Sequence, residues 1–180
     1  GNIHVIYLSS SMVYGNFKED QVDENSICEP IGIYGNLKLA GELMIKSFNQ
    51  VFGMPYTIIR PSALYGERCI SRRVGQIFIE SALNKSEITI NGDGKEKLDF
   101  TYIEDLTDGI ICSLKSKNSL QETFNITYGN SRPINRLLEL IKDNFAEVRV
   151  SYKTRDKLMP KRGTLSISKA KRLIKFNSRW

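Results

Sequence analysis

The chain has 180 residues, of which 41% are hydrophobic, and it carries a formal net charge of +6 at pH 7. This length suits one domain of ordinary size. No run of about eighteen apolar residues is present, so we expect no membrane-spanning helix. The N-terminus has no basic region ahead of its apolar run, which excludes a signal peptide.

Apolar runs and helical periodicity alternate along the chain. In chain order we predict strand 3–8, helix 33–52, strand 56–60, helix 71–84, strands 87–91 and 99–103, helix 105–115, strand 123–127, helix 133–145, strand 147–152 and helix 167–176. The helix that follows residue 103 is predicted to be capped near Asp105. Alternating strands and helices are typical of the α/β class.

Tyr34 and Lys38 lie four residues apart at the start of helix 33–52, so they share one helix face. A tyrosine ordinarily titrates near ~10, and a neighbouring cation lowers an acid's pKa by roughly 1–3 units. The pair therefore suggests a base that removes a proton from a hydroxyl. The helix is indicated by apolar residues that recur every three or four positions, namely Leu37, Ala40, Met44, Phe48 and Val51.

Tyr14 and Lys18 repeat the tyrosine–lysine spacing, but polar and aperiodic residues follow them. This pattern indicates a loop, so we do not assign them the same role. Ser9, Ser10 and Ser11 follow strand 3–8, and chemistry in open α/β sheets collects beyond the carboxyl ends of strands. A hydroxyl-rich turn would explain these serines equally well.

The remaining chemistry-bearing residues are few. His4 is the sole histidine and lies within an apolar strand, which favours packing over catalysis. Cys28, Cys69 and Cys112 are odd in number and lack metal-ligand companions. We therefore expect free thiols in a reducing cytoplasm, and no metal site.

Five motifs occur one after another between residues 9 and 105. They are Ser9-Ser10-Ser11 before Val13-Tyr14-Gly15, Tyr34 with Lys38, Arg60-Pro61 with Tyr65-Gly66, Gly92-Asp93-Gly94, and Asp99-Phe100-Thr101-Tyr102 with Asp105. In this order and spacing they resemble the extended short-chain dehydrogenase/reductase superfamily. The resemblance is to its NAD-dependent epimerase/dehydratase family, which acts mostly on nucleotide sugars.

The resemblance implies an α/β fold, namely the C-terminal part of a Rossmann-type doubly wound sheet plus a small α+β substrate-binding lobe. Residues 1–65 and 100–128 would belong to the NAD-binding sheet, and residues 66–99 and 129–180 to the lobe. It also implies NAD as the cofactor and three catalytic residues, Ser10, Tyr34 and Lys38. Ser9 and Pro61 would lie near the cofactor, beside Tyr34 and Lys38.

The family's glycine-rich turn, which grips the cofactor pyrophosphate, has no counterpart in the sequence. We therefore expect the chain to lack the N-terminal cofactor-binding half, which leaves the NAD site incomplete. The end at Trp180 is also expected to fall short of a last helix. A catalytically inactive fragment is accordingly an alternative to an enzyme.

Three departures from the family pattern bear on the substrate. Ser11 and Met12 stand where dehydratases carry Asp and Glu, and neither can do carboxylate acid–base work, which disfavours 4,6-dehydration. Ala63 replaces a frequent asparagine. Leu98 replaces an arginine that usually holds the diphosphate, and leucine cannot make that contact. A 4-epimerase is the first expectation, and a carbonyl or keto-sugar reductase the second.

Other basic residues would have to hold the diphosphate, unless the substrate is not an ordinary nucleotide sugar. The candidates are Arg68, Arg72, Arg73 and the Lys161–Arg162 pair. We predict a substrate site made of Ser11, Met12, Ala63, Arg68, Arg72 and Arg162.

The charge is concentrated at the C-terminal end, where residues 151–180 carry net +9 and the rest of the chain net −3. A solvated surface, a site for a sugar-nucleotide diphosphate, and a nucleic-acid site all remain open for this segment. No stacking aromatic residues interleave with these charges in the manner of a nucleic-acid platform, which disfavours nucleic acid. We expect a nucleotide-sugar substrate, a homodimer formed through helix 33–52, and no membrane association.

Overall fold

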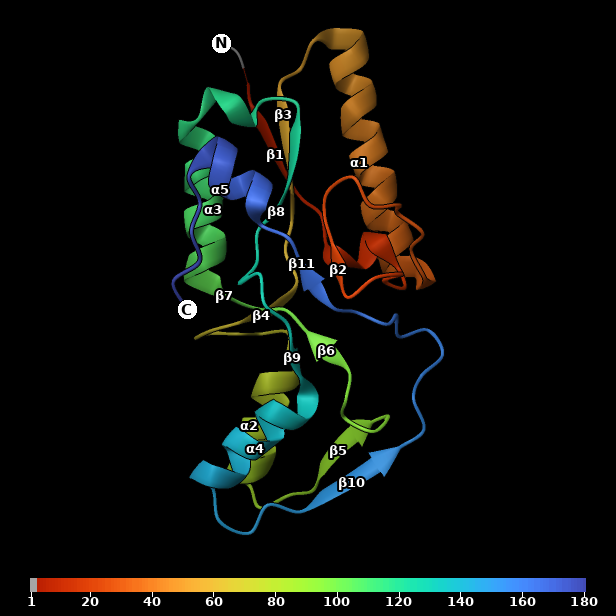
Figure 1. Ribbon diagram of the computed structural model, residues 1–180, viewed down its shortest axis with the longest axis vertical. Helices are drawn as coiled ribbons and strands as arrows, with labels where there is room; N and C mark the ends of the chain where they lie inside the picture. Colours follow the sequence, from red (N-terminus) through yellow and green to blue (C-terminus); the bar gives the residue numbers. More distant parts are fainter. Residues whose placement is uncertain (1–2) are drawn as a thin grey trace.

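A three-stranded parallel sheet with strand order β1-β3-β8 forms the upper part of the molecule in Figure 1. The computed structural model describes residues 3–180. The strands are β1 (Val5–Leu8), β3 (Tyr56–Arg60) and β8 (Glu122–Asn125). β3 lies in the centre and all of its residues are buried, as is typical of a parallel strand that is covered on both faces.

Helices cover both faces of this sheet. α1 (Gly32–Phe52) stands on one side, and α3 (Ile103–Lys115) and α5 (Ser168–Ile174) lie on the other (Figure 1). The 3₁₀ turn η2 (Lys117–Ser119) joins α3 to β8. The core between the sheet and α3 and α5 contains Ile59, Leu106, Phe124, Ile126, Ile167, Ala170, Ile174 and Phe176. Among the described residues, no helix is both long and apolar enough to cross a membrane.

A smaller lobe with its own apolar core hangs below the sheet (Figure 1). It consists of α2 (Val74–Leu83), α4 (Ile134–Asn144) and the parallel pair β5 (Ile88–Asn91) and β10 (Val150–Lys153). Its core contains Phe78, Ala82, Ile88, Ile90, Leu138 and Ile141.

Short strand pairs connect the sheet to the smaller lobe. β4 (Ala63–Tyr65) pairs in parallel with β7 (Phe100–Tyr102). The other pairs are β6 (Lys97–Leu98) with β9 (Arg132–Pro133), and β2 (Gln21–Val22) with β11 (Thr164–Leu165). The 3₁₀ turn η1 (Ser11–Tyr14) follows β1 directly.

The α/β class predicted from the sequence is confirmed, and every predicted element is present with its ends shifted by three residues or fewer. The predicted cap of α3 is wrong. The helix begins at Ile103 after Tyr102, and Asp105 lies inside its first turn. The buried Asp105 carboxylate instead accepts the backbone N–H groups of Arg179 and Trp180, at 2.9 and 3.3 Å.

After the smaller lobe the chain returns to the main sheet. α5 packs on β8 and η2 of the main sheet, where Ala170 and Ile174 are buried. Residues 168–174 therefore follow the sheet in their packing, because their apolar side chains complete the core beside Phe124 and Ile126.

The apolar face of α1 points away from the sheet. The recurring residues that indicate the helix are largely exposed, with Leu37 at 66% and Val51 at 71%. The buried residues of α1 are Gly35, Glu42 and Ile45. The helix ends where Gly53 adopts a left-handed conformation (φ 66°) and donates its N–H to Asn49, a common helix-terminating arrangement.

The contact between α3 and the end of β8 depends on a glycine. A Cβ atom added at Gly109 would lie 2.5 Å from Cγ2 of the fully buried Ile126. Overpacking costs about 1–3 kcal/mol, whereas alanine gains at most about 1 kcal/mol of helix propensity over glycine. We therefore expect Gly109→Ala to lower the free energy of unfolding by about 1–2 kcal/mol, measured by urea denaturation.

Gly75 in α2 is the matched control, since a Cβ there would meet nothing within 4 Å. Gly75→Ala is expected to be neutral or slightly stabilising. Equal stabilisation by both substitutions would refute the close approach of α3 to Ile126.

Candidate active site

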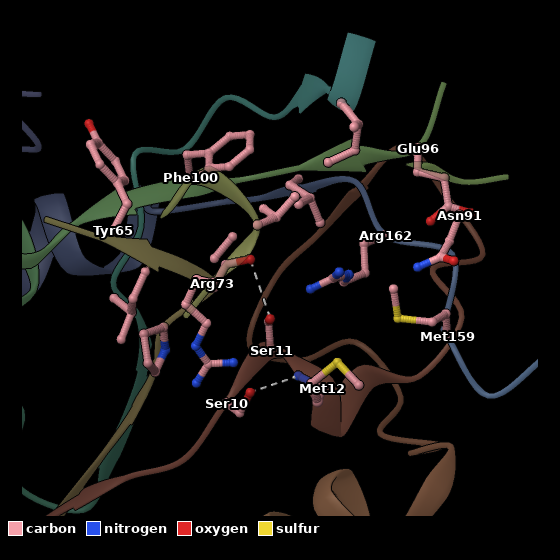
Figure 2. A pocket seen from close by; sticks show the side chains of 18 of the residues that line it. Ser10, Ser11, Met12, Tyr65, Arg73, Asn91, Glu96, Phe100, Met159 and Arg162 are labelled. Atoms are coloured by element: carbon pink, nitrogen blue, oxygen red, sulfur yellow. Dashed lines mark hydrogen bonds between the residues drawn. The ribbon is translucent and has the colours of Figure 1, made fainter. Parts of the chain in front are cut away.

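A cavity of about 380 Å³ lies where the carboxyl ends of β1 and β3 meet the smaller lobe (Figure 2). Both parts of the fold contribute to its walls. The lining residues include Ser9, Ser10, Ser11, Met12, Tyr34, Pro61, Ala63, Arg73, Asn91, Glu96, Leu98 and Arg162. Most residues of the predicted site therefore meet here. Lys38, Arg68 and Arg72 do not line this cavity.

Tyr34 and Lys38 share one face at the start of α1. The Lys38 ammonium lies 5.7 Å from the centroid of the Tyr34 ring. It donates a hydrogen bond of 2.8 Å to the carbonyl of Leu8, the last residue of β1. This bond fixes the ammonium at the carboxyl end of the sheet, beside the phenol. The Tyr34 side chain is half exposed and lines the cavity.

The three serines after β1 differ in their hydrogen bonds. Ser9 donates to Oε1 of Glu42 at 2.5 Å, and Ser11 donates to Ser62 at 3.4 Å. Ser10 caps η1, because its oxygen accepts the N–H of Met12 at 3.2 Å (Figure 2). That bond uses an acceptor site of the Ser10 hydroxyl and leaves its hydrogen able to donate into the cavity.

A buried ion pair lies behind the serines. Glu42 of α1 and Arg60 of β3 form two hydrogen bonds, at 2.9 and 2.6 Å, and their side chains are at most 4% exposed. Arg60 also donates to the hydroxyl of Tyr14 at 3.0 Å, and Tyr14 donates to Asn125 at 2.8 Å. With Ser9, this network connects α1, β1, η1, β3 and β8 beneath the cavity.

The pKa values in this network reflect burial and pairing. Burial alone would lower the pKa of Arg60, but its hydrogen bonds and charge interactions with Glu42, together with Tyr14, raise it above the ordinary value. Burial raises the pKa of Tyr14 well above its usual range, although Arg60 opposes the shift. Tyr14 is therefore a neutral hydrogen-bonding group of the interior. Lys18 pairs with Glu29 on the surface at 3.1 Å, so the second tyrosine–lysine spacing brings no pair together.

Two arginines extend into the cavity from the lobe side, Arg73 and Arg162 (Figure 2). Burial lowers the pKa of Arg162, an effect that Glu96 opposes. The Arg162 Nε atom is buried and makes no hydrogen bond within residues 3–180. Leu98 is buried in the cavity wall and supplies no charge there. Arg162 therefore lines the cavity with a guanidinium group whose buried Nε has no partner among the described residues.

The other predicted arginines face elsewhere. Arg72 forms an ion pair of 2.9 Å with Glu80 of α2. Arg68 lines a separate groove on the other side of the segment that follows Gly66. The site predicted from the sequence includes Arg68 and Arg72 but not Arg73. Only the path of the backbone directs Arg73 into the cavity.

Several residues of the site carry no local sequence signal of a role. Glu42 lies within a helix with no motif around it. Asn91 ends β5, which pairs with β10, and Glu96 directly precedes β6, which pairs with β9; both residues line the cavity. The Gly92-Asp93-Gly94 motif indicates the turn between β5 and β6. It does not indicate which side chains of this region face the cavity. His4 donates or accepts a hydrogen bond of 2.9 Å with Thr57 and lies outside the site.

Comparisons with known proteins identify the family. The profile of the NAD dependent epimerase/dehydratase family matches residues 1–127. The UDP-glucose epimerase YtcB of Bacillus subtilis (strain 168), itself described as uncharacterized, is 33% identical over 174 residues, which are 96% of this chain and 54% of YtcB. The chain belongs to the NAD-dependent epimerase/dehydratase family.

Solved structures agree with this assignment. UDP-glucuronic acid 4-epimerase from Bacillus cereus, in complex with UDP-glucuronic acid and NAD, superposes with a TM-score of 0.92 at 28% identity, over 98% of this chain and 57% of that one. UDP-glucose 4-epimerase from Thermotoga maritima, with UDP-glucose, gives 0.90 at 28% identity, over 98% and 58%. The chain thus spans little more than half the length of the relatives it matches.

The buried ion pair yields a stability prediction. Glu42→Leu leaves the Arg60 charge buried without a partner, which costs about 3–5 kcal/mol, and Arg60→Leu has the converse effect. In the double variant neither charge is left alone, so we expect it to lose less free energy of unfolding than either single variant. Urea denaturation at 25 °C measures all three.

The exposed pair Arg136–Glu139, whose atoms lie 2.9 Å apart, serves as the control. Removing either partner there is expected to cost less than about 1 kcal/mol. Additive losses in the Glu42 and Arg60 variants would show that the two charges do not depend on each other.

Proposed function

We propose that this chain supplies the catalytic and substrate-binding part of an NAD-dependent nucleotide-sugar 4-epimerase. The observation that carries the proposal is the placement of Tyr34, with Lys38 fixed beside it, at the cavity that Ser10 lines. Its relatives with solved structures include 4-epimerases in complex with UDP-sugars. The activity of the whole protein and its substrate are part of the proposal.

The residues at the sheet end of the cavity fit the nicotinamide–ribose end of a dinucleotide. The Lys38 ammonium uses one of its three N–H groups on the Leu8 carbonyl, and the others remain for ribose hydroxyls. Ser9 and Pro61 line the cavity on the same side. NAD, when bound, supplies a reversible hydride acceptor. This sequence contains no glycine-rich turn for the cofactor pyrophosphate.

The chain's own residues handle the proton. Tyr34 takes the proton of the sugar hydroxyl on its phenol oxygen as the hydride leaves the same carbon, and it returns the proton when the hydride returns to the opposite face. The Lys38 ammonium, 5.7 Å from the centroid of the Tyr34 ring, places a positive charge beside the phenol. Ser10 donates its free hydroxyl hydrogen to the reacting oxygen.

The residues that would bind the substrate are suited to holding a diphosphate group. They are not suited to catalysing dehydration. Arg162, with its unpaired buried Nε, and Arg73 would hold the diphosphate in place of the arginine that Leu98 replaces. Charged guanidinium groups bind phosphate oxygens through strong hydrogen bonds. Ser11 and Met12 offer no carboxylate for the expulsion of water. The carboxylate of Glu96 forms an ion pair with Arg155, with 2.5 Å between Nε and Oε1.

We also propose that residues 1–65 and 100–128 serve the cofactor, and that residues 66–99 and 129–180, although α5 packs on the sheet, bind the nucleotide sugar. The two separate apolar cores support this division. A cytoplasmic location is part of the same proposal. It is supported by Cys28, Cys69 and Cys112, which form no disulfide.

We expect Tyr34→Phe to lower kcat in the natural protein by about 10²–10⁴-fold, since it removes the proton acceptor. Interconversion of UDP-glucose or UDP-glucuronic acid with its C4 epimer, followed by chromatography, measures the change. Tyr152→Phe is the control, because Tyr152 is an exposed tyrosine of β10 that does not itself line the cavity.

Turnover of Tyr34→Phe within tenfold of the unmodified protein would refute its role as the base. Net oxidation of the reduced cofactor by a keto-sugar nucleotide, without interconversion of the C4 epimers, would instead favour a reductase.

We further propose that α1 forms a homodimer with a second copy of the chain. Seven large apolar side chains of α1 are exposed, namely Ile33, Leu37, Leu43, Met44, Phe48, Val51 and Phe52. The charged residues of the helix, Lys38, Glu42 and Lys46, lie off this stripe. A long apolar stripe without charges is typical of a helix face that packs on another helix, and a two-fold axis would bury both stripes together.

A double substitution, Phe48→Glu with Val51→Glu, places two charges in this stripe far from the cavity. We expect it to convert a dimer to a monomer, measured by sedimentation. Gln50→Glu on the neighbouring exposed position is the control and should leave the dimer intact. A monomeric unmodified protein, or a double variant that stays dimeric, would contradict the proposed interface.

A further inference from the structure

A second and larger hollow, of about 780 Å³, lies on the other side of the segment that follows Gly66. We call it the α2–α4 groove, because those helices form its two banks and β7 lies at its base. Its floor is apolar and consists of Tyr65, Ile79, Phe100, Tyr102, Leu137 and Leu140. Cavities of this size with mainly apolar and aromatic walls are typical of small-molecule sites.

The floor of the groove is open to solvent. Ile79 is 43% exposed and Leu140 is 45% exposed, and they lie on neighbouring helices. Isolated exposed apolar residues are common on protein surfaces, but several that meet in one hollow indicate a binding surface. The catalytic cavity, in contrast, is lined by hydroxyl and amide groups as well as apolar ones. The two hollows are therefore suited to different ligands.

Arginines surround this apolar floor. Arg68, Arg73, Arg132 and Arg136 all line the α2–α4 groove. Within residues 3–180, Arg68, Arg73 and Arg132 form no ion pair with a carboxylate, whereas Arg136 pairs with Glu139. Arg132 instead donates to the side-chain oxygen of Asn130 at 2.6 Å, and Arg73 donates to Ser71 at 3.0 Å.

The nearby carboxylates are already engaged. Glu67, which also lines the groove, accepts the hydroxyl hydrogen of Tyr102 at 2.9 Å. Glu80 is paired with Arg72 at 2.9 Å. The rim therefore keeps an excess of positive charge over an apolar floor.

We propose that the α2–α4 groove binds a small amphiphilic anion. The apolar body of the ligand lies on Ile79, Leu137 and Leu140, and its phosphate, sulfonate or carboxylate head contacts the arginine rim. Apolar burial supplies affinity, and charge-assisted hydrogen bonds to guanidinium select an anion. This inference does not depend on the proposed epimerase activity, because the residues that line the groove, apart from Tyr65, Arg73, Gly75 and Phe100, lie outside the cavity assigned to that activity.

Trp180 provides an internal reporter for the test. It is the only tryptophan of the chain, and its ring centroid lies 5.7 Å from that of Tyr102 in the groove wall. We would titrate the protein with dodecyl phosphate, below its micelle concentration, and follow tryptophan fluorescence. We expect a saturable change with one ligand per chain. Dodecyltrimethylammonium, which has the same tail and the opposite charge, should bind at least about tenfold more weakly.

Two variants address the two parts of the site separately. Leu140→Glu alters the floor and Arg132→Glu alters the rim, and each should weaken dodecyl phosphate binding at least about tenfold. Lys142→Glu is the matched control, since Lys142 is an exposed cation of α4 that does not line the groove. Its affinity should stay that of the unmodified protein. Circular dichroism establishes that each variant is folded, and Arg132→Gln replaces Arg132→Glu if the latter is not.

The proposal is overturned if dodecyl phosphate causes no saturable change, or if the cationic amphiphile binds as tightly as the anionic one. It is overturned equally if propyl phosphate matches dodecyl phosphate, because the apolar floor then contributes nothing. Loss of binding in Lys142→Glu comparable to that in Arg132→Glu would show only a general attraction to a basic surface, and would also overturn it.

Discussion

The buried pair of Glu42 and Arg60 determines how α1 sits on the sheet. A carboxylate that leaves water loses several kcal/mol unless a partner of good geometry compensates, so the helix must turn Glu42 inward, where Arg60 of β3 meets it with two hydrogen bonds. Tyr34, Lys38 and Glu42 follow one another at intervals of four residues and therefore share one face of α1. The helix rotation that brings Glu42 to Arg60 thus also directs Tyr34 and Lys38 to the carboxyl end of β1. There Ser9 donates a hydrogen bond to Glu42, and the Leu8 carbonyl accepts one from Lys38. The stability of the fold and the geometry of the proposed site rest on the same ion pair.

The same constraint explains why the apolar face of α1 is on the outside. Hydrophobic periodicity predicts the helix correctly, but it does not determine whether the apolar side of the helix faces the core or the surface. Here the electrostatic anchor at Glu42 and the small residue Gly35, where an added Cβ would lie 2.7 Å from the Met12 carbonyl oxygen, occupy the buried side. The exposed stripe is therefore a consequence of the inward pair. The periodic apolar residues that indicate the helix therefore lie on the surface of the chain, and we propose that they contact a second copy.

How far the sequence predicts this structure depends on the range of the interactions involved. β3 and α1 are long and locally determined, and both were predicted within one residue of their bounds. β2 was missed, because Gln21–Val22 is a strand only through its pairing with Thr164–Leu165, far along the chain. In the site, the spacing of Tyr34 and Lys38 is a local feature of the sequence, and the helix places both side chains on one face. The choice of Arg73 over Arg68 and Arg72 depends on how the backbone turns after Gly66, which no local pattern records.

That turn also links the two hollows of the molecule. Arg68 and Arg72 both adopt left-handed backbone conformations, at φ 60° and 44°, which cost of order 1–3 kcal/mol each for residues other than glycine. Their strain is confined to the segment that ends at Arg73, and Tyr65, Arg73, Gly75 and Phe100 line both the catalytic cavity and the α2–α4 groove. The two hollows are therefore adjacent and share these four residues. A ligand in the groove that favours one position of Arg73 must change the affinity of the catalytic cavity for an anion, and by linkage an anion in the cavity must change the affinity of the groove by the same factor. The strained segment is the element through which that coupling would act, because Arg73 is the cation common to both sites.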